Sequence, residues 1–526
     1  MAYEGETPAP AQLTTPPEAV VETTLGKVRG ARRRDIYQFK GAPYAADPVG
    51  EGRFQPPRPR EPWSGVRATL TYGPVCPQVV DGAGRRNSEV KFLFDWDDGF
   101  QGEDCLALNV WTPGVGAGAR PVMVWLHGGG YEFGSAQELP SYDGENLARR
   151  GDVVVVSLNH RLGAFGYLNL SGLGGAFEGA VNVGQLDIVA ALQWVLDNIA
   201  AFGGDPGAVT LFGQSGGAGK INALMAMPAA KGLFHKAILQ SGSQLGVASP
   251  ERSGELARGV LRELEIDPAR AESLLEVPLG RLLQAAQAAD RALPRTPGGP
   301  PWETMGWQPT VDGQVIPAQT WTPHAPAQSA DIPILVGSTL YERPPSLGNP
   351  AGEAMSEESM LKRLGFAHGE HAASVAATFR TTRSGVTPAE IVALANSHGF
   401  GRIPCVSQAR RKAAQNAAPA WLYWFSWATP VLDGRPRSFH CSELAFAFDN
   451  IDRCLNATGG GEGARRLAGR MADAWISFAR TGDPNHADLP PWAPVGAGGL
   501  PTMMFDDVCE VLDDPDRDER AALTGR

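Results

Sequence analysis

A serine flanked by glycines follows a short apolar run in the sequence Gly213-Gln214-Ser215-Gly216-Gly217. The spacing G-x-S-x-G between a strand and a helix is typical of a serine held on a sharp turn, where its hydroxyl can act as a nucleophile. A serine alone is a poor nucleophile, so this chemistry also needs a base, an acid that orients the base, and donors for a developing oxyanion. The alternative is a tight turn that needs glycine only for close packing.

The same stretch ends in Gly219-Lys220, which raises the alternative of a phosphate-binding loop. The pattern G-x-x-x-x-G-K-[ST] requires glycine at position 214 and serine or threonine at position 221. The chain has Gln214 and Ile221 at these positions. The sequence therefore does not support a phosphate-binding loop.

A second glycine cluster, His127-Gly128-Gly129-Gly130, follows the apolar run 122–126. Backbone N–H groups with no side chains around them suit an oxyanion, which needs donors at about 3 Å. An ordinary glycine turn is the alternative. Two motifs of one mechanism, in the appropriate order along the chain, favour nucleophilic catalysis.

Elements of two kinds must position these motifs. Runs 122–126, 153–158 and 207–213 are typical of short buried strands, and residues 186–199 have apolar side chains at helical spacing before Gly203 ends the pattern. Further apolar runs occur in "KAILQSGS" and "PILVGST". Continuous apolar strands that alternate with helices predict an α/β fold with a mostly parallel sheet.

Composition excludes several classes of function. The 526 residues are 43% hydrophobic and 20% charged, as in globular proteins, and the net charge of −11 disfavours nucleic acid and anionic membranes as partners. We find no apolar stretch long enough for a membrane span, and residues 1–19 form a polar, proline-rich arm without the features of a secretory signal. These features predict a cytoplasmic protein whose six cysteines are reduced by default: Cys76, Cys105, Cys405, Cys441, Cys454 and Cys509.

With these motifs in place, the chain resembles the type B carboxylesterases, the carboxylesterase/cholinesterase family of the α/β-hydrolases. The resemblance runs from about residue 20 to about residue 510, through "EDCLALNVWTP", "HGGGYEFGS", "NHRLGAFGYL", "NIAAFGGDPGAVTLFGQSGGA" and "QPTVDGQVIP". Ala107 departs from the usual second signature. The resemblance implies a large, mostly parallel central sheet flanked by helices, with insertions that cover the site. It implies one domain over 20–515, between the flexible arm 1–19 and a polar C-terminal tail 516–526.

The acid and the base follow the serine in this fold, in the order serine, acid, histidine. Among nine histidines, His440 lies in "RSFHCSELAF", which resembles the family segment H-x-x-E-[LI] and so implies the general base. Glu342 in "GSTLYER" resembles the acid of G-x-T-x-x-E-G, with Arg343 where the family usually has glycine. An arginine there can strain the loop or pair with the acid. Asp449 is the next candidate for the acid.

The resemblance also implies oxyanion donors at the backbone N–H groups of Gly129, Gly130 and Gly216, and a serine, Ser241, that braces the acid. Candidate substrate contacts are Gln214, Trp96 and Tyr131. The aromatic side chains of the segment 92–100 either face the substrate or pack inward. Gln214 stands where the family commonly has glutamate, and a carboxylate there would favour the protonated imidazole.

Cys76 and Cys105 flank a loop that a disulfide often closes in the family. The resemblance therefore implies that the two cysteines lie close together. Whether they are bonded stays open, because the missing export signal predicts reduced thiols.

Together these expectations describe a serine ester hydrolase that forms an acyl-enzyme on small or medium esters. No metal and no organic cofactor is expected. A specialised carbamate or toxin-ester hydrolase is the alternative within the family. A non-catalytic scaffold protein of the same fold is the alternative outside catalysis, and it is disfavoured because every residue of the mechanism is present.

Overall fold

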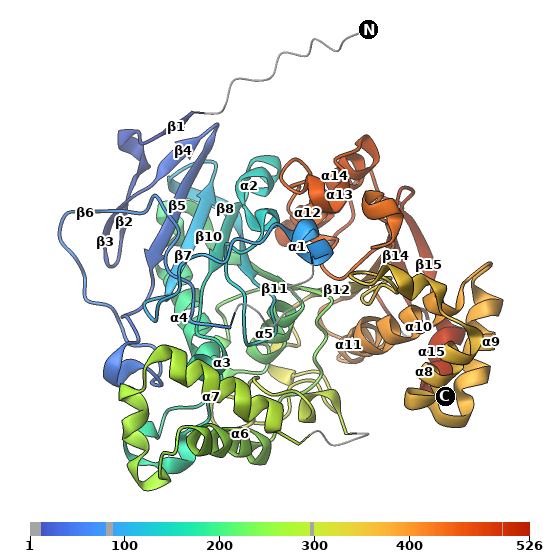
Figure 1. Ribbon diagram of the computed structural model, residues 1–526. Coiled ribbons are helices and arrows are strands. Elements are labelled where there is room, and N and C mark those ends of the chain that lie inside the picture. The colour runs from blue at the N-terminus through green and yellow to red at the C-terminus, as the bar shows by residue number, and fades with distance from the viewer. Residues whose placement is uncertain (1–11, 80–87, 295–298, 497, 526) are drawn as a thin grey trace.

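The computed structural model describes residues 12–79, 88–294, 299–496 and 498–525. A twelve-stranded sheet runs through the described part of the chain (Figure 1). Its centre is parallel, as the apolar runs predict, and the strands follow one another across the sheet in this order: β9 (Val154–Leu158), β8 (Gly116–Leu126), β10 (Phe202–Gln214), β11 (Lys236–Gln240), β12 (Ile334–Thr339), β13 (Ala420–Phe425) and β14 (Pro501–Phe505).

Antiparallel strands flank this parallel centre. One edge consists of β1 (Leu13–Thr14), β4 (Ala31–Arg33), β5 (Ile36–Pro43) and β7 (Ala107–Thr112), and the other is β15 (Glu510–Asp513). A separate small sheet contains β2 (Val20–Thr23), β3 (Gly26–Arg29) and β6 (Val66–Ala68). Of the predicted arm 1–19, residues 1–11 lie outside the described residues, whereas Leu13–Thr14 pair with β4.

Alternating side chains of the central strands build two cores. In β8, Val122, Val124 and Leu126 belong to one apolar cluster, whereas Met123 and Trp125 belong to the other. This alternation is the period of two that a strand imposes on its side chains. The first core also receives α4 (Val183–Asn198), α5 (Gly216–Leu224) and α11 (Ile403–Ala413), and the second receives α2 (Glu145–Gly151), α12 (Leu444–Ala447) and α14 (Glu462–Thr481).

The strand register brings the predicted motifs to one edge. Gly213 of β10 pairs with Leu126 of β8 on one side and with Leu239 of β11 on the other. The glycine loop after β8 and the serine after β10 therefore leave the sheet at the same level, at the carboxyl ends of the strands. Open parallel sheets bind their ligands at that edge.

Further helices surround the sheet. Helices α6 (Pro250–Glu263) and α7 (Leu279–Ala292) pack on each other, and α1 (Ser88–Phe94), α3 (Gly163–Tyr167) and α13 (Leu455–Thr458) are short. A third apolar cluster joins α8 (Glu357–His368), α9 (Ala372–Thr382) and α10 (Pro388–Ser397) to α15 (Arg517–Thr524) (Figure 1). Among the described helices, none combines the length and the apolar character that crossing a membrane requires.

Residues 517–524 of the predicted polar C-terminal tail 516–526 form helix α15. Asp516 is 1% exposed and Glu519 is 2% exposed. Asp516 accepts a hydrogen bond from Arg402, and Glu519 accepts one from Arg383. The segment has the charge expected of a solvated tail. Its carboxylates are instead buried because they neutralise buried cations, which a composition-based prediction does not detect.

Candidate active site

Ser215 lies on a strained turn between β10 and α5. Its backbone has φ 55° and ψ −123°, in a region that residues other than glycine rarely adopt. Two hydrogen bonds hold the turn, from Ser215 N to Gln240 O at 2.8 Å and from Gly219 N to Ser215 O at 3.0 Å. Strain of this kind persists only where the surrounding structure fixes it, and it typically marks functional sites. The turn is the sharp strand-to-helix geometry that the G-x-S-x-G spacing predicts.

The two glycine motifs meet at this turn. A Cβ atom added to Gly216 would lie 2.1 Å from the carbonyl oxygen of Gly130, so only glycine allows the two backbones to approach. Neither Gly129 nor Gly130 donates its N–H to another described residue. Gly216 is the first residue of α5 and has no carbonyl one turn earlier to receive its N–H. Three backbone donors are thus available for an oxyanion.

Lys220 supports the glycine loop, a role that the sequence analysis did not assign. The side chain is completely buried, and its Nζ donates to the carbonyl oxygens of His127 at 2.9 Å and of Gly128 at 3.5 Å. Burial lowers the pKa of this amine to about 7. The lysine that suggested a phosphate loop therefore fixes the direction of the peptide groups before Gly129.

Glu342 and His440 are hydrogen-bonded, with Nδ1–H of the imidazole donating to Oε2 of the carboxylate. A backbone bridge between Tyr341 and Phe439 brings their two loops side by side. The carboxylate is buried, and its Oε1 accepts from Thr339 N at 3.0 Å. The predicted acid, Glu342, thus contacts the predicted base, His440, directly in the structure.

Gly401 is a second residue that the sequence analysis missed. A Cβ atom at this position would lie 2.8 Å from Oε1 of Glu342, so any side chain there would displace the acid. Its sequence context, "SHGFGRIP", carries no catalytic pattern from which this role could be inferred.

Gln214 connects the serine turn to the histidine. Cys441 Sγ donates to Gln214 Oε1 at 3.1 Å, which orients the amide so that Nε2 faces the imidazole, 3.3 Å from His440 Nε2 and 3.4 Å from Nδ1. Among the described residues, Ser215 Oγ makes no hydrogen bond with His440. Catalytic hydrogen bonds are often long without substrate and tighten in the complex.

Arg343 neither pairs with Glu342 nor strains the loop. Its backbone lies outside the left-handed region, so the position does not require the glycine that the family usually has. Its backbone N donates to Ser397 Oγ at 3.1 Å, and its guanidinium lies over the ring of Phe400, 4.6 Å from the centroid. Phe400 also contacts His440 edge-on, with 5.4 Å between ring centroids.

Asp449, the next candidate for the acid, pairs with an arginine instead of with the histidine. Asp449 Oδ2 accepts from Arg150 Nη1 at 3.3 Å, and both side chains are partly exposed. Ser241 is buried, but its hydroxyl has no hydrogen-bond partner among the described residues, so the bracing contact expected with Glu342 is not formed. Its strained φ of 50° and the bond from Ser241 N to Gly337 O at 2.8 Å place it next to the acid loop.

Glu443 is a buried acid behind the site. It has no exposed surface, and one oxygen accepts from Gln240 Nε2 at 3.3 Å, whereas the other has no partner among the described residues. Trp475 Nε1 donates to Gln240 Oε1 at 3.2 Å and so fixes the orientation of that amide. Burial, followed by the charge of Glu342, raises the pKa of Glu443 to about 8.

The candidate substrate contacts have different surroundings. Tyr131 is 1% exposed and donates to Gln244 Oε1 at 2.8 Å, so it supports the glycine loop and offers no surface to a substrate, contrary to the prediction. Trp96 is partly buried against Phe94, with 4.8 Å between ring centroids, and Phe94 packs on Phe439. Packing therefore accounts for Phe94, whereas Phe100 is exposed.

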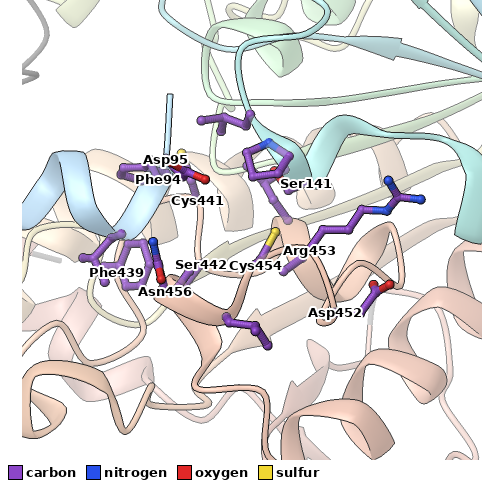
Figure 2. Close-up of a pocket in the computed structure, with 17 residues that line it drawn as sticks. Phe94, Asp95, Ser141, Phe439, Cys441, Ser442, Asp452, Arg453, Cys454 and Asn456 are labelled. Atoms are coloured by element: carbon purple, nitrogen blue, oxygen red, sulfur yellow. The ribbon is translucent and has the colours of Figure 1, made fainter. Parts of the chain in front are cut away.

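A pocket of about 210 Å³ lies beside the segment 439–445 of the chain (Figure 2). Both sequence neighbours of the histidine, Phe439 and Cys441, line it, together with Phe94 and Cys454. Ser215 and the oxyanion glycines do not line it.

Cys76 and Cys105 are neighbours, as the resemblance implies, but both are free thiols. Their hydrogen bond is the largest cause that raises the pKa of Cys105 well above its usual range, and burial adds to it. Leu162 N donates to Cys76 Sγ at 3.2 Å. The thiols are therefore accommodated as a packed, hydrogen-bonded pair, and the disulfide that the sequence left open is not formed.

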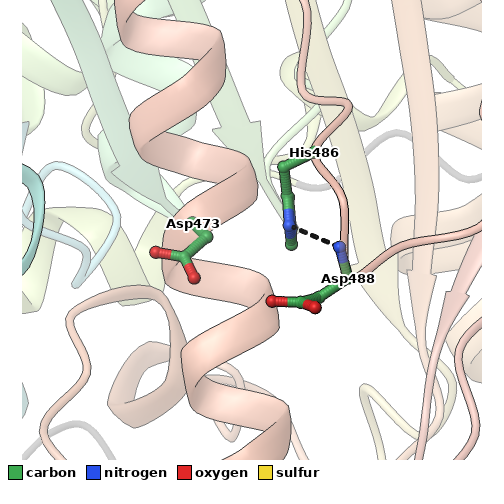
Figure 3. A group of neighbouring side chains, drawn as sticks. All are labelled: Asp473, His486 and Asp488. Atoms are coloured by element: carbon green, nitrogen blue, oxygen red, sulfur yellow. Dashed lines mark hydrogen bonds between the residues drawn. The ribbon is translucent and has the colours of Figure 1, made fainter.

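Asp473, His486 and Asp488 offer ligand atoms within 4.8 Å of one another (Figure 3). Protein groups already engage the cluster. Arg150 binds both oxygens of Asp473 at 2.7 Å, His486 Nε2 donates to Arg470 O at 2.9 Å, and Nδ1 accepts from Asp488 N at 3.3 Å. Both imidazole nitrogens are used, so the cluster does not favour a metal.

Comparisons with known proteins agree with this geometry. The model of the carboxylesterase family matches residues 17–507. The para-nitrobenzyl esterase of Bacillus subtilis is 35% identical over 96% of this chain and 98% of its own length, and the phenmedipham hydrolase of Pseudarthrobacter oxydans is 36% identical over 93% of each. The solved structure of a Clostridium hathewayi esterase that can hydrolyse aliphatic aromatic polyesters superposes with a TM-score of 0.83 at 34% identity over 98% of this chain and 99% of that one.

These matches span nearly the full length of the chain and of the relatives. They confirm the α/β-hydrolase fold and the expectation of a carboxylic ester hydrolase, and they exclude a likeness limited to single motifs. The chain belongs to the carboxylesterase family, and it is a serine carboxylesterase.

Proposed function

We propose that Ser215, His440 and Glu342 form the catalytic triad, with the backbone N–H groups of Gly129, Gly130 and Gly216 as the oxyanion hole. The hydrogen bond between Glu342 and His440, on loops that leave the same edge of the sheet as the strained Ser215, is the observation that carries this proposal. A buried carboxylate bound to Nδ1–H fixes the tautomer in which Nε2 carries no proton and can accept one.

The reaction proceeds in two transfers. In the first, His440 Nε2 takes the proton of Ser215 Oγ as the oxygen attacks the ester carbonyl, and the tetrahedral oxyanion is bound by the three glycine N–H groups. The imidazolium then gives its proton to the leaving alcohol. In the second, water adds to the acyl carbonyl as His440 takes its proton. Collapse of the intermediate then releases the carboxylic acid and returns the proton to Ser215 Oγ.

Lys220 and Gly401 are positioning residues in this scheme. Lys220 holds the carbonyl groups of His127 and Gly128 away from the oxyanion and so directs the following N–H groups toward it. Gly401 leaves the space that the carboxylate of Glu342 occupies. We further propose that the substrate is a small or medium ester and that the enzyme acts in the cytoplasm.

An active-site label tests the nucleophile. An organophosphate should add covalently to Ser215, and Ser215→Ala should lose both the label and ester turnover. Glu342→Gln should lower kcat by about 10³- to 10⁴-fold with the fold intact, because the neutral amide no longer orients the imidazole or stabilises its cation. A label mapped to another serine would contradict the assignment.

Phenmedipham is a second substrate to test, because the phenmedipham hydrolase of Pseudarthrobacter oxydans is 36% identical over 93% of this chain. Turnover of phenmedipham that Ser215→Ala abolishes would extend the reaction beyond simple esters at the same triad. A chromogenic short-chain ester serves as the reference substrate.

A further inference from the structure

Among the described residues, Arg343 has no carboxylate partner, unlike Arg435 and Arg437. In the neighbouring loop, Arg435 pairs with Glu89 at 2.5 Å, and Arg437 pairs with two glutamates. Arg343 directly follows Glu342 and is exposed, and no carboxylate among the described residues lies within ion-pair distance of it. In a chain with a net charge of −11, this cation is available to a ligand.

One aromatic ring connects this free cation to the catalytic histidine. The guanidinium carbon lies 4.6 Å from the centroid of the Phe400 ring, a distance typical of a cation–π contact. The same ring lies 5.4 Å from the imidazole of His440 and is 43% exposed. The bond from Arg343 N to Ser397 Oγ fixes the backbone beneath this arrangement.

The chemistry of these groups defines what fits. Guanidinium donors bind carboxylates with a planar pair of hydrogen bonds, and an exposed phenyl ring packs against another ring. His440 must protonate the leaving oxygen, so the alcohol part of the ester lies against the surface beside the imidazole. In this enzyme that surface includes the ring of Phe400, and the guanidinium of Arg343 lies over the same ring.

We propose that Phe400 and Arg343 form a subsite for esters of aromatic alcohols that carry a carboxylate. The ring of the leaving group packs on Phe400, and its carboxylate pairs with Arg343. The inference rests on the proposed function, because it takes His440 as the group that faces the leaving alcohol, and it names the substrate class within that function.

Paired substrates and paired variants test the subsite. The probes are 4-acetoxybenzoate and its neutral analogue 4-acetoxybenzamide, with kcat/KM measured for the wild type, Arg343→Gln, Arg343→Lys and Arg466→Gln. Arg466 is an exposed arginine of α14 that pairs with Glu462, so its loss changes the net charge equally at a distant place. Comparing each ester with itself across variants cancels its intrinsic reactivity.

Arg343→Gln should lower the preference for the anionic ester over the neutral ester by about three- to tenfold, the range for a partly exposed charge pair. Arg343→Lys should retain part of the preference, Arg466→Gln should retain all of it, and added salt should weaken it in the wild type. Unchanged turnover of 4-acetoxybenzamide in Arg343→Gln would confirm that the triad is intact.

An unchanged preference in Arg343→Gln, with the neutral ester still hydrolysed, would overturn the subsite and leave the proposed function in place. An equal loss in Arg466→Gln would also overturn it, because the effect would then belong to net charge. A wild type that hydrolyses neither probe nor a chromogenic acetate would overturn the proposed function itself.

Discussion

Gln214 is the residue whose chemistry separates this site from the common family pattern. Its amide N–H faces the imidazole of His440, whereas a glutamate would place a carboxylate oxygen there. A nearby negative charge favours the protonated imidazole, which cannot act as a base. A neutral amide therefore suits activity toward lower pH.

Gln214→Glu should move the acidic limb of kcat/KM to higher pH, because the added carboxylate favours the protonated imidazole. The profile of kcat/KM against pH is the appropriate measurement because it reports ionisations of the free enzyme. Gln214→Met, which removes the donor without adding a charge, serves as control. An acidic limb that stays in place in Gln214→Glu would show that the residue acts only through hydrogen bonds.

Lys220 carries a prediction of a different kind. Lys220→Met keeps an unbranched, slightly shorter side chain but removes the two hydrogen bonds to the carbonyl groups before the glycine loop. We expect kcat to fall by about ten- to a hundredfold with little change in KM, because misdirected N–H groups weaken the transition state more than the bound ester. An equal loss in Lys220→Met of kcat and of thermal stability, with KM raised, would point to a packing role alone.

At the scale of elements, the site depends on a π-helix, η14 (His398–Arg402), that carries Phe400 and Gly401. Arg402 anchors it from within: the residue is 1% exposed and donates to both oxygens of Asp516 at 2.9 and 3.1 Å. The ring of Trp424 lies 4.6 Å from its guanidinium carbon. Asp516, the residue before α15, thus fixes the π-helix that lies beside His440.

Asp516→Asn should destabilise the protein by about 3 kcal/mol, since it removes the countercharge of the buried Arg402 and also weakens the bond that Arg520 Nε donates to Asp516 at 3.0 Å. The double variant Arg402→Met/Asp516→Leu should cost less than the sum of the two single changes, because it removes both charges together. Midpoints of urea unfolding for the four proteins provide the measurement. Additive costs would show that the two residues are energetically independent.

Sequence reasoning predicted the elements that have strong periodicity and the residues that lie in motifs. The parallel strands, the helix α4 and the acid–histidine pair follow from apolar runs and from family segments. Lys220 and Gly401 did not follow, because their roles depend on what long-range packing places beside them. The arrangement of Arg343 on Phe400 joins positions 57 residues apart in the chain (343 and 400), and no local pattern encodes it.

At the scale of the whole molecule, Glu443 links stability to pH. An ordinary glutamate has a pKa of 4.5, and the folded protein raises that of Glu443 to about 8. Between these values the folded state keeps a proton that the unfolded chain has released, so this residue lowers the stability progressively as pH rises from about 4.5 to 8. Above that range the cost is constant.

Glu443→Gln should therefore stabilise the protein more at pH 9 than at pH 5, with a difference of roughly 2–4 kcal/mol. The amide can still accept the hydrogen bond from Gln240 and has the shape of the protonated acid. Thermal unfolding of both proteins at the two pH values provides the test. A gain that does not depend on pH would mean that Glu443 is ionised in the folded protein throughout.

The contact between Asp516 and Arg402 also sets an order of events during synthesis. The strands, the glycine loops, the nucleophile, the acid and the base all precede residue 516 in the chain. The π-helix that carries Phe400 is fixed only when the carboxylate of Asp516 reaches the buried guanidinium of Arg402. A nascent chain whose residue 516 is still inside the ribosome contains every catalytic group. It lacks the ion pair between Asp516 and Arg402 that fixes the segment beside the histidine. Esterase activity should therefore appear late in translation, well after the serine motif has emerged.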